Sequence, residues 1–254
     1  MARSTIKLDD LPIEITVQNK KTMEKYRAYL TEDHPIFSVV VGPQDIQRER
    51  EALAQFDFPE PRRSAPDGNN DLENASVYHQ IAERLPEFDA MLIHGSAIAL
   101  EGQAYLFLAP SGTGKSTHAR LWRERFGGRA VMVNDDKPML RFRDGRAFIC
   151  GTPWQGKHDL GNNISVPLRA VCILRRSPRN HIEPLSPMAA FPALLQQCYS
   201  FEDPRHAERM LHLAERLAAS VPAFFLGCNM EPGAAETAYA GIRNYLTKDR
   251  EECT

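Results

Sequence analysis

The sequence predicts an α/β protein with a sheet at its centre and a small α+β module at its N-terminus. From residue 72 to the C-terminus, apolar runs of strand length alternate with longer amphipathic segments of helix length, which is typical of α/β domains. Residues 1–60 instead combine strand-like runs with short, charged, helix-like segments. Prolines, a glycine and two asparagines crowd into residues 56–72, as they do in linkers. We therefore predict two domains, residues 1–60 and residues 72–254.

Four segments define the N-terminal module. Residues 11–17 alternate apolar and polar side chains, which indicates a half-buried strand. Residues 36–41 form a second strand-like run that stops at a Gly-Pro pair. Residues 20–30 and 44–54 are charged and fit helices. The module carries no chemical motif, so its role stays open between substrate recognition and assembly.

The larger domain is predicted from the alternation of its segments. The predicted strands are residues 90–94, 104–108, 129–133, 171–174 and 223–226. The predicted helices are residues 71–85, 114–125, 187–199, 204–219 and 234–246. Residues 104–108 are almost wholly apolar, which predicts a central strand covered on both faces. A hairpin-like turn at residues 101–103 precedes this strand, and the sequence does not decide whether the sheet is wholly parallel.

Composition excludes several classes of function. The 254 residues contain 31 Lys and Arg against 33 Asp and Glu, so the net charge is -2, without the basic surplus typical of nucleic-acid partners. The first ten residues lack the apolar core of a secretory signal, and no apolar run has the ~20 residues of a membrane span. The five cysteines show no CxxC or CxxH spacing, which argues against zinc and for reduced thiols. We expect a soluble cytoplasmic protein.

The strongest motif is a phosphate-binding loop at Ala109–Thr117, which matches the Walker A pattern GxxxxGK[ST] with alanine at the first glycine. An apolar strand precedes the loop and an amphipathic helix follows it, so a chance glycine-rich turn is the weaker interpretation. Backbone N–H groups and the helix N-terminus attract phosphate oxygens. Lys115 would hold the β and γ phosphates of ATP, and the Ser116 hydroxyl would bind Mg²⁺. The predicted nucleotide-binding residues are Ser111, Gly112, Thr113, Gly114, Lys115, Ser116 and Thr117.

An acidic pair follows the phosphate loop within one helix and one strand. The strand at residues 129–133 ends in Asn134-Asp135-Asp136, so both carboxylates are expected near the same phosphates. One of Asp135 and Asp136 would hold Mg²⁺ and the other would accept a proton from an attacking hydroxyl. The residues alone do not assign these two roles, and the alternative is an Asp-Asp turn that caps the next element.

Two further features are candidates for the site. His94 ends the strand at residues 90–94 and would lie near the loop if that strand neighbours residues 104–108; the alternative is a structural hydrogen-bonding histidine. Gly151–Lys157 combines two glycines, a proline, a tryptophan and a lysine, a composition that suits a binding loop. Trp154, Gln155 and Lys157 are its candidate substrate-binding residues, with a surface turn as the alternative.

In combination, these motifs resemble the catalytic domain of bacterial HPr serine kinase/phosphorylase, a fold related to ATP-dependent phosphoenolpyruvate carboxykinase. The discriminating feature is the short interval between Lys115 and the Asp135-Asp136 pair. The chain most resembles HPr-kinase-like proteins of peptide-modification clusters, including lasso-peptide kinases. It shares with them a His-Gly-Ser-Ala stretch at His94–Ala97 and a Gly-Thr-Pro-Trp-x-Gly-Lys segment at Gly151–Lys157.

The resemblance implies an ATP- and Mg²⁺-dependent kinase that phosphorylates a hydroxyl, such as a serine of a peptide or protein, with His94 ordering the site. HPr kinases carry an acidic, glycine-rich signature where this chain has the Trp154/Lys157 loop, which argues against HPr as the acceptor. HPr kinases form hexamers, so a homo-oligomer is among the implied properties. Two alternatives stay open: a kinase of a small molecule, such as a free amino acid or organic acid, and a non-catalytic nucleotide-dependent binding protein.

Overall fold

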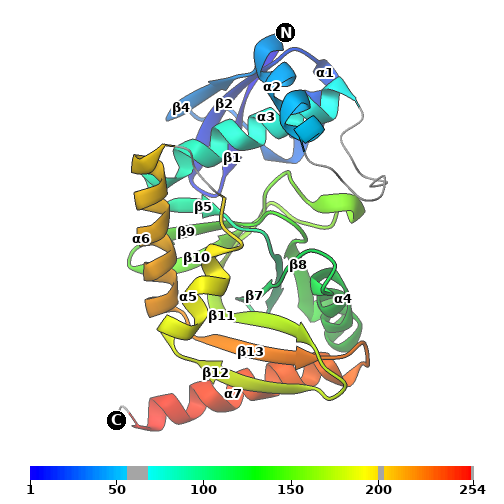
Figure 1. The fold of residues 1–254 in the computed structure, drawn as a ribbon, viewed down its shortest axis with the longest axis vertical. Coiled ribbons are helices and arrows are strands. Elements are labelled where there is room, and N and C mark those ends of the chain that lie inside the picture. Colours follow the sequence, from blue (N-terminus) through cyan, green and yellow to red (C-terminus); the bar gives the residue numbers. More distant parts are fainter. Residues whose placement is uncertain (56–67, 200–202, 253–254) are drawn as a thin grey trace. The chain divides into compact units, whose positions relative to one another are not determined.

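The chain folds into two compact units, Met1–Leu85 and Pro86–Thr254 (Figure 1). The structure, a computed structural model, describes residues 1–55, 68–199 and 203–252. Most of the predicted linker, including its three prolines, lies outside these residues. The division into units differs from the predicted domains by helix α3 (Asn69–Arg84), which belongs to the first unit. Helix α3 buries Leu72, Val77 and Ile81, so it contributes to the core of that unit.

The first unit contains a four-stranded mixed sheet in the order β3-β1-β2-β4. Its strands are β1 (Ala2–Leu8), β2 (Leu11–Val17), β3 (Leu30–Thr31) and β4 (Phe37–Val40). Strands β1 and β2 form an antiparallel hairpin, whereas β4 runs parallel to β2. Strand β2 buries Ile13, Ile15 and Val17 and leaves Glu14 and Thr16 partly exposed, which is the predicted alternation. Strand β1 was not predicted.

Three helices accompany this sheet: α1 (Lys20–Glu24), α2 (Pro43–Gln55) and α3. The predicted helix at residues 20–30 ends early, at Glu24, and a 3-10 turn at Arg27–Tyr29 follows it. The Asn19 side chain caps α1 by accepting a hydrogen bond from the Lys21 amide at 3.0 Å. The buried Glu73 carboxylate of α3 accepts hydrogen bonds from the Gln18 amide, from the Asn19 amide at 3.2 Å and from Thr22 Oγ1 at 2.6 Å. This carboxylate therefore ties the start of α1 to α3.

We expect Glu73→Ala to destabilise the first unit by about 2–3 kcal/mol, because three donors lose their acceptor around a site that is 1% exposed. The change should be measured by urea unfolding followed by far-UV circular dichroism. Both tryptophans, Trp122 and Trp154, lie in the second unit, so their emission reports that unit separately and should not shift. Glu83→Ala, an exposed site on the same helix, is the control. Equal stability of the two variants would contradict this role of Glu73.

The second unit is built on a nine-stranded mixed sheet in which β7, β11 and β13 run parallel. Its strands are β5 (Ala90–Leu92), β6 (Ser96–Leu100), β7 (Gln103–Leu108), β8 (Ala130–Asn134), β9 (Met139–Arg143), β10 (Arg146–Cys150), β11 (Ser165–Arg176), β12 (His181–Leu185) and β13 (Ala223–Cys228). The long strand β11 pairs with β10 near its start and with β13 near its end. The sheet is therefore not wholly parallel, which answers the question that the sequence left open.

Helices cover both faces of this sheet (Figure 1). They are α4 (Lys115–Phe126), α5 (Pro187–Leu195), α6 (Pro204–Ser220) and α7 (Gly233–Glu252). Helices α5 and α6 pack into the core that contains Leu106 and Leu108, whereas α4 and α7 pack into the core that contains Tyr105 and Phe107. Strand β7 thus has both faces covered, as its apolar sequence predicts. The architecture is mixed α/β.

Two observations concern the expectations about membrane spans and cysteines. Within residues 1–55, 68–199 and 203–252, no helix has both the length and the apolar character needed to cross a bilayer. The four described cysteines, Cys150, Cys172, Cys198 and Cys228, are free thiols. Cys253 lies outside the described residues.

Candidate active site

The predicted phosphate loop connects β7 to α4. Leu108 ends the strand, Lys115 is the first helical residue, and Gly114 occupies the N-cap with φ of 125°. Gly112 also has a positive φ, 76°. A Cβ at either glycine would have space but a strained backbone, because L-residues rarely adopt these angles. The glycines at these two positions therefore allow the loop to turn over the N-terminus of the helix.

Lys115 lies inside the loop. Its side chain is buried, and Nζ donates a hydrogen bond to the carbonyl oxygen of Ala109 at 2.7 Å, with Pro110 O at 3.5 Å. Burial lowers the pKa of Lys115, and the charge of Asp136 partly offsets this effect. A buried ammonium that bonds only to carbonyl oxygens lacks a full anionic partner. The residues present fit a phosphate group, which would supply that negative charge.

Asp135 faces the start of α4 from the end of β8. Its carboxylate accepts a hydrogen bond from Ser96 Oγ of β6 at 2.7 Å, and the Ser116 hydroxyl lies near the same carboxylate. Burial raises the pKa of Asp135, and the two serine hydroxyls act in the opposite direction. Strand β6 lies between β7 and β8 in the sheet, so it places Ser96 next to both predicted elements of the site.

Asp136 lies beside two basic side chains and is more exposed than Asp135. Its carboxylate is 3.5 Å from His94 Nε2 and 3.4 Å from Lys137 Nζ. Burial lowers the pKa of His94 to about 4, and the charges of Lys137 and Lys115 act in the same direction. The imidazole is therefore neutral near pH 7, and its contact with Asp136 is polar rather than an ion pair.

His94 reaches the site by a route that the sequence did not indicate. Its strand, β5, pairs with β9 and not with β7. The chain then turns at residues 93–95, where the Gly95 amide donates to the carbonyl oxygen of Asp136 at 3.1 Å and the His94 amide donates to that of Gln197 at 2.7 Å. A Cβ at Gly95 would come within 2.9 Å of side-chain atoms of Leu106 and Leu108, so any larger residue in this turn would have to displace side chains of β7.

Asn134 holds the turn that carries both carboxylates. Its side chain is fully buried: Oδ1 accepts from the amides of Asp136 at 2.9 Å and Lys137 at 2.8 Å, and Nδ2 donates to Thr152 O at 3.0 Å and Oγ1 at 3.1 Å. Thr152 Oγ1 in turn donates to Lys137 O at 2.6 Å. Asn134 thus joins the acidic turn to the Gly151–Lys157 segment.

The Gly151–Lys157 segment therefore packs against the acidic pair. Trp154 is buried and its carbonyl oxygen accepts from the Lys137 amide at 3.2 Å. A Cβ at Gly156 would lie 3.1 Å from the Cβ of Asp136. Gln155 lies close to Gly161. Lys157 falls in a 3-10 turn, Gly156–His158, but its side chain is outside the described part of the chain. Of the predicted substrate-loop residues, Trp154 supports the acidic turn from within the fold.

We expect Asn134→Ala to lower any activity of this site by about 10–100-fold, because residues that orient site groups have effects of this size. The loss of four hydrogen bonds in a fully buried position should also cost about 2–4 kcal/mol of stability. Activity should be measured below the unfolding transition of the variant. Asn244→Ala on α7, where the side chain is exposed, is the matched control. Normal activity in Asn134→Ala would show that the turn needs no anchor.

The donor set around Ser116 suits Mg²⁺, which prefers hard oxygen ligands and keeps several waters. The Ser116 hydroxyl lies near the Asp135 carboxylate, with Asp136 next in the chain. Among the described residues there is no group of three or more His, Cys, Asp and Glu that could hold a metal ion. A magnesium ion shared with phosphate oxygens needs only one or two protein ligands.

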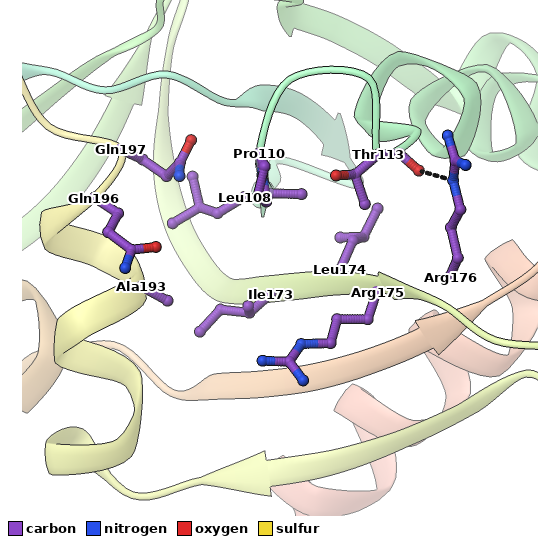
Figure 2. Close-up of a pocket in the computed structure, with 11 residues that line it drawn as sticks. Leu108, Pro110, Thr113, Ile173, Leu174, Arg175, Arg176, Ala193, Gln196 and Gln197 are labelled. Atoms are coloured by element: carbon purple, nitrogen blue, oxygen red, sulfur yellow. Dashed lines mark hydrogen bonds between the residues drawn. The ribbon is translucent and has the colours of Figure 1, made fainter.

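A cavity of about 380 Å³ lies beside the loop, between β11 and α5 (Figure 2). Leu108, Pro110 and Ile173 give it apolar walls, and Gln196 and Gln197 face it from the end of α5. Helix α5 ends at Leu195, earlier than predicted. Ser96, Gln197 and Arg176, which contacts the loop from β11, were not predicted as site residues. No local motif marks Gln197 or Arg176, whereas Ser96 lies in the His94–Ala97 stretch and could have been found from it.

The other predicted loop residues take up different positions. Ser111, Gly112 and Ser116 are exposed, whereas Thr113, Gly114 and Thr117 are half-buried. The structure thus brings Lys115, Ser116, Asp135, Asp136 and His94 to one end of the sheet.

Comparisons with known proteins give a family and distant structural similarities. Among curated proteins, no match is found. Among solved structures, the chain is similar to the Hpr(Ser) kinase/phosphatase from Coxiella burnetii, with a TM-score of 0.39 and 10% sequence identity over 64% of this chain and 94% of that chain. We draw no conclusion about this chain from a similarity at that TM-score. The model of the family described as SynChlorMet cassette protein ScmC matches residues 65–234. This match spans more than half of the 254 residues, so the chain belongs to the ScmC family.

Proposed function

We propose that the chain is an ATP- and Mg²⁺-dependent kinase that transfers the γ-phosphoryl group to a serine hydroxyl of a peptide or protein. One observation carries the proposal: the Asp135 carboxylate lies beside Ser116, at the start of the helix whose first residue is the buried Lys115. A phosphate-binding cation, a hydroxyl and a carboxylate at one helix N-terminus are the parts that phosphoryl transfer requires.

In this proposal Lys115 and the loop amides bind the β and γ phosphates. Lys115 exchanges its hydrogen bonds to Ala109 O and Pro110 O for phosphate oxygens. Ser116 and Asp135 hold Mg²⁺, which when bound neutralises charge on the β and γ phosphates. Asp135 takes this role, rather than Asp136, because it is the carboxylate whose pKa the nearby Ser116 hydroxyl lowers.

Asp136 accepts the proton from the acceptor hydroxyl as the hydroxyl oxygen bonds to the γ phosphorus. The bond between that phosphorus and the β–γ bridging oxygen breaks, and ADP leaves with the electron pair. Asp136 suits this role because its side chain is 34% exposed and so is open to an incoming group. Neutral His94 at 3.5 Å and Lys137 at 3.4 Å orient the carboxylate.

The choice of a serine acceptor in a peptide or protein rests on the resemblance to lasso-peptide kinases at His94–Ala97 and Gly151–Lys157. The test is transfer of label from γ-labelled ATP with Mg²⁺ to serine-bearing peptides, HPr, free serine and a cell extract. We expect label on a peptide or protein serine and none after EDTA. Label on a small molecule alone would support a kinase but would contradict a peptide or protein as its acceptor. Tight ATP binding without transfer to any acceptor would favour a nucleotide-dependent binding protein.

A further inference from the structure

Arg176 lies at the end of β11 and contacts the phosphate loop from outside. Its Nη2 donates to the carbonyl oxygen of Gly112 at 2.6 Å and its Nε donates to that of Thr113 at 3.3 Å. Figure 2 shows the guanidinium beside Thr113, with a dashed line for its hydrogen bond to the Thr113 carbonyl oxygen. The side chain is exposed, so these two bonds to successive carbonyls, and not burial, hold it in place.

The two carbonyls determine where the loop amides point. In a trans peptide unit the C=O of one residue and the N–H of the next face opposite ways. The Gly112 and Thr113 carbonyls face Arg176, so the amides of Thr113 and Gly114 face away from it. The Thr113 amide lies 3.3 Å from Pro110 O, and the Gly114 amide belongs to the N-cap residue of α4. Amides at this end of a helix are the ones that bind phosphate.

The strand that carries Arg176 is paired on both sides within the sheet. Strand β11 is parallel to β7, with Ile173 paired to Leu108, and parallel to β13, with Arg176 paired to Cys228. The backbone of Arg176 is therefore held by the sheet that also carries the start of the loop. The guanidinium offers its donors in a planar fork and stays charged at all relevant pH values.

We infer that Arg176 is a positioning residue that orders the phosphate loop before nucleotide arrives. The expected effect on nucleotide affinity rests on the proposed function. The ordering of the loop by Arg176 does not, because it occurs in the protein without nucleotide. Lys115 holds the start of the loop through Ala109 O and must release it to bind phosphate. Arg176 holds the end of the loop and can stay in place throughout.

The first measurement is hydrogen exchange of the loop peptide, residues 109–117, in the full chain without nucleotide. We expect Arg176→Ala to speed this exchange and Arg179→Ala to leave it unchanged; Arg179 is an exposed arginine three residues further along. Unchanged exchange in Arg176→Ala would overturn the inference, whether or not the chain is a kinase. Faster exchange with no nucleotide binding by the unmodified protein would instead overturn the proposed function and leave the ordering role.

The second measurement is the affinity for ATP and for ADP. We expect Arg176→Ala to weaken both about tenfold, the equivalent of ordering one residue's backbone, with kcat at saturation little changed. Arg176→Lys should be intermediate, because an ammonium does not present the planar fork of a guanidinium. Added guanidinium ion should partly restore Arg176→Ala but not alter Arg179→Ala. A loss for ATP only, or in kcat only, would instead indicate contact with the γ phosphate and overturn the positioning role.

Discussion

Lys115→Met is expected to lower phosphoryl transfer by about 10³-fold, because removal of one charge-stabilising donor at a reaction centre has effects of this size. The ammonium is the only charged side-chain donor that bonds to the described residues of the loop from inside. Transfer should be measured from γ-labelled ATP under the conditions in which the unmodified protein labels its acceptor. Affinity for ATP, measured by calorimetry, should fall as well, since the same group binds the ground-state phosphates.

The fold of Lys115→Met should survive. Methionine keeps most of the volume of the lysine stem. Burial of the lysine ammonium is unfavourable, as its lowered pKa shows, and the methionine variant no longer buries that charge. Thermal unfolding should therefore stay within a few degrees of the parent. Lys248→Ala, exposed on α7, serves as the matched lysine control. Transfer by Lys115→Met within tenfold of the parent would show that phosphate binds elsewhere.

The fold was predictable where local signals and packing agree. Residues 104–108 form β7 because an unbroken apolar run suits a strand with helices on both faces. The β9–β10 hairpin was missed although its signal was present. Asp144-Gly145 joins the two strands with φ of 49° and 71°, and Asp-Gly is the residue pair that such two-residue turns favour.

Two other features could not be predicted, because they depend on contacts between elements and not on a local sequence pattern. Strand β1 is only partly buried and owes its conformation to pairing with β2 and β3. Helix α3 belongs to the first unit through the buried Glu73, whose partners lie more than 50 residues away. No local composition reveals a hydrogen bond of that span, so the boundary that the sequence favoured lies before this helix.

The candidate site divides in the same way. Lys115 and the acidic pair were found because their chemistry needs fixed residue types at short spacing. Ser96 is 39 residues from Asp135 and Arg176 is 64 residues from Gly112, so only the order of β6, β7 and β11 in the sheet brings them to the loop. The sequence left the roles of Asp135 and Asp136 open because neighbouring residues share every local signal. Their different contacts, Ser96 beside Asp135 and His94 and Lys137 beside Asp136, are the basis of the roles that we propose.

Asp136→Asn and Asp135→Asn should both reduce transfer, but for different reasons. In the proposed function Asp136→Asn removes the proton acceptor, so we expect transfer to fall by about 10³-fold while ATP affinity and the Mg²⁺ concentration for half-maximal rate stay unchanged. Asp135→Asn removes the proposed magnesium ligand. Outer-sphere partners of bound metals alone change affinity about 10–100-fold, so the Mg²⁺ requirement should rise at least tenfold. A magnesium titration of each variant makes the distinction.

The thermal stability of Asp135→Asn provides a second, independent test of the assignment of Asp135. Burial raises its pKa above the unfolded value, so the ionised carboxylate at neutral pH opposes folding, and that cost disappears as pH falls through the raised pKa. A neutral asparagine, which can still accept from Ser96 Oγ, should therefore leave Asp135→Asn at least as heat-stable as the parent without Mg²⁺. If Asp136→Asn raised the Mg²⁺ requirement and Asp135→Asn did not, the two roles would be reversed. If both variants kept near-normal transfer, neither carboxylate would be the base, because a neutral amide cannot take up the hydroxyl proton.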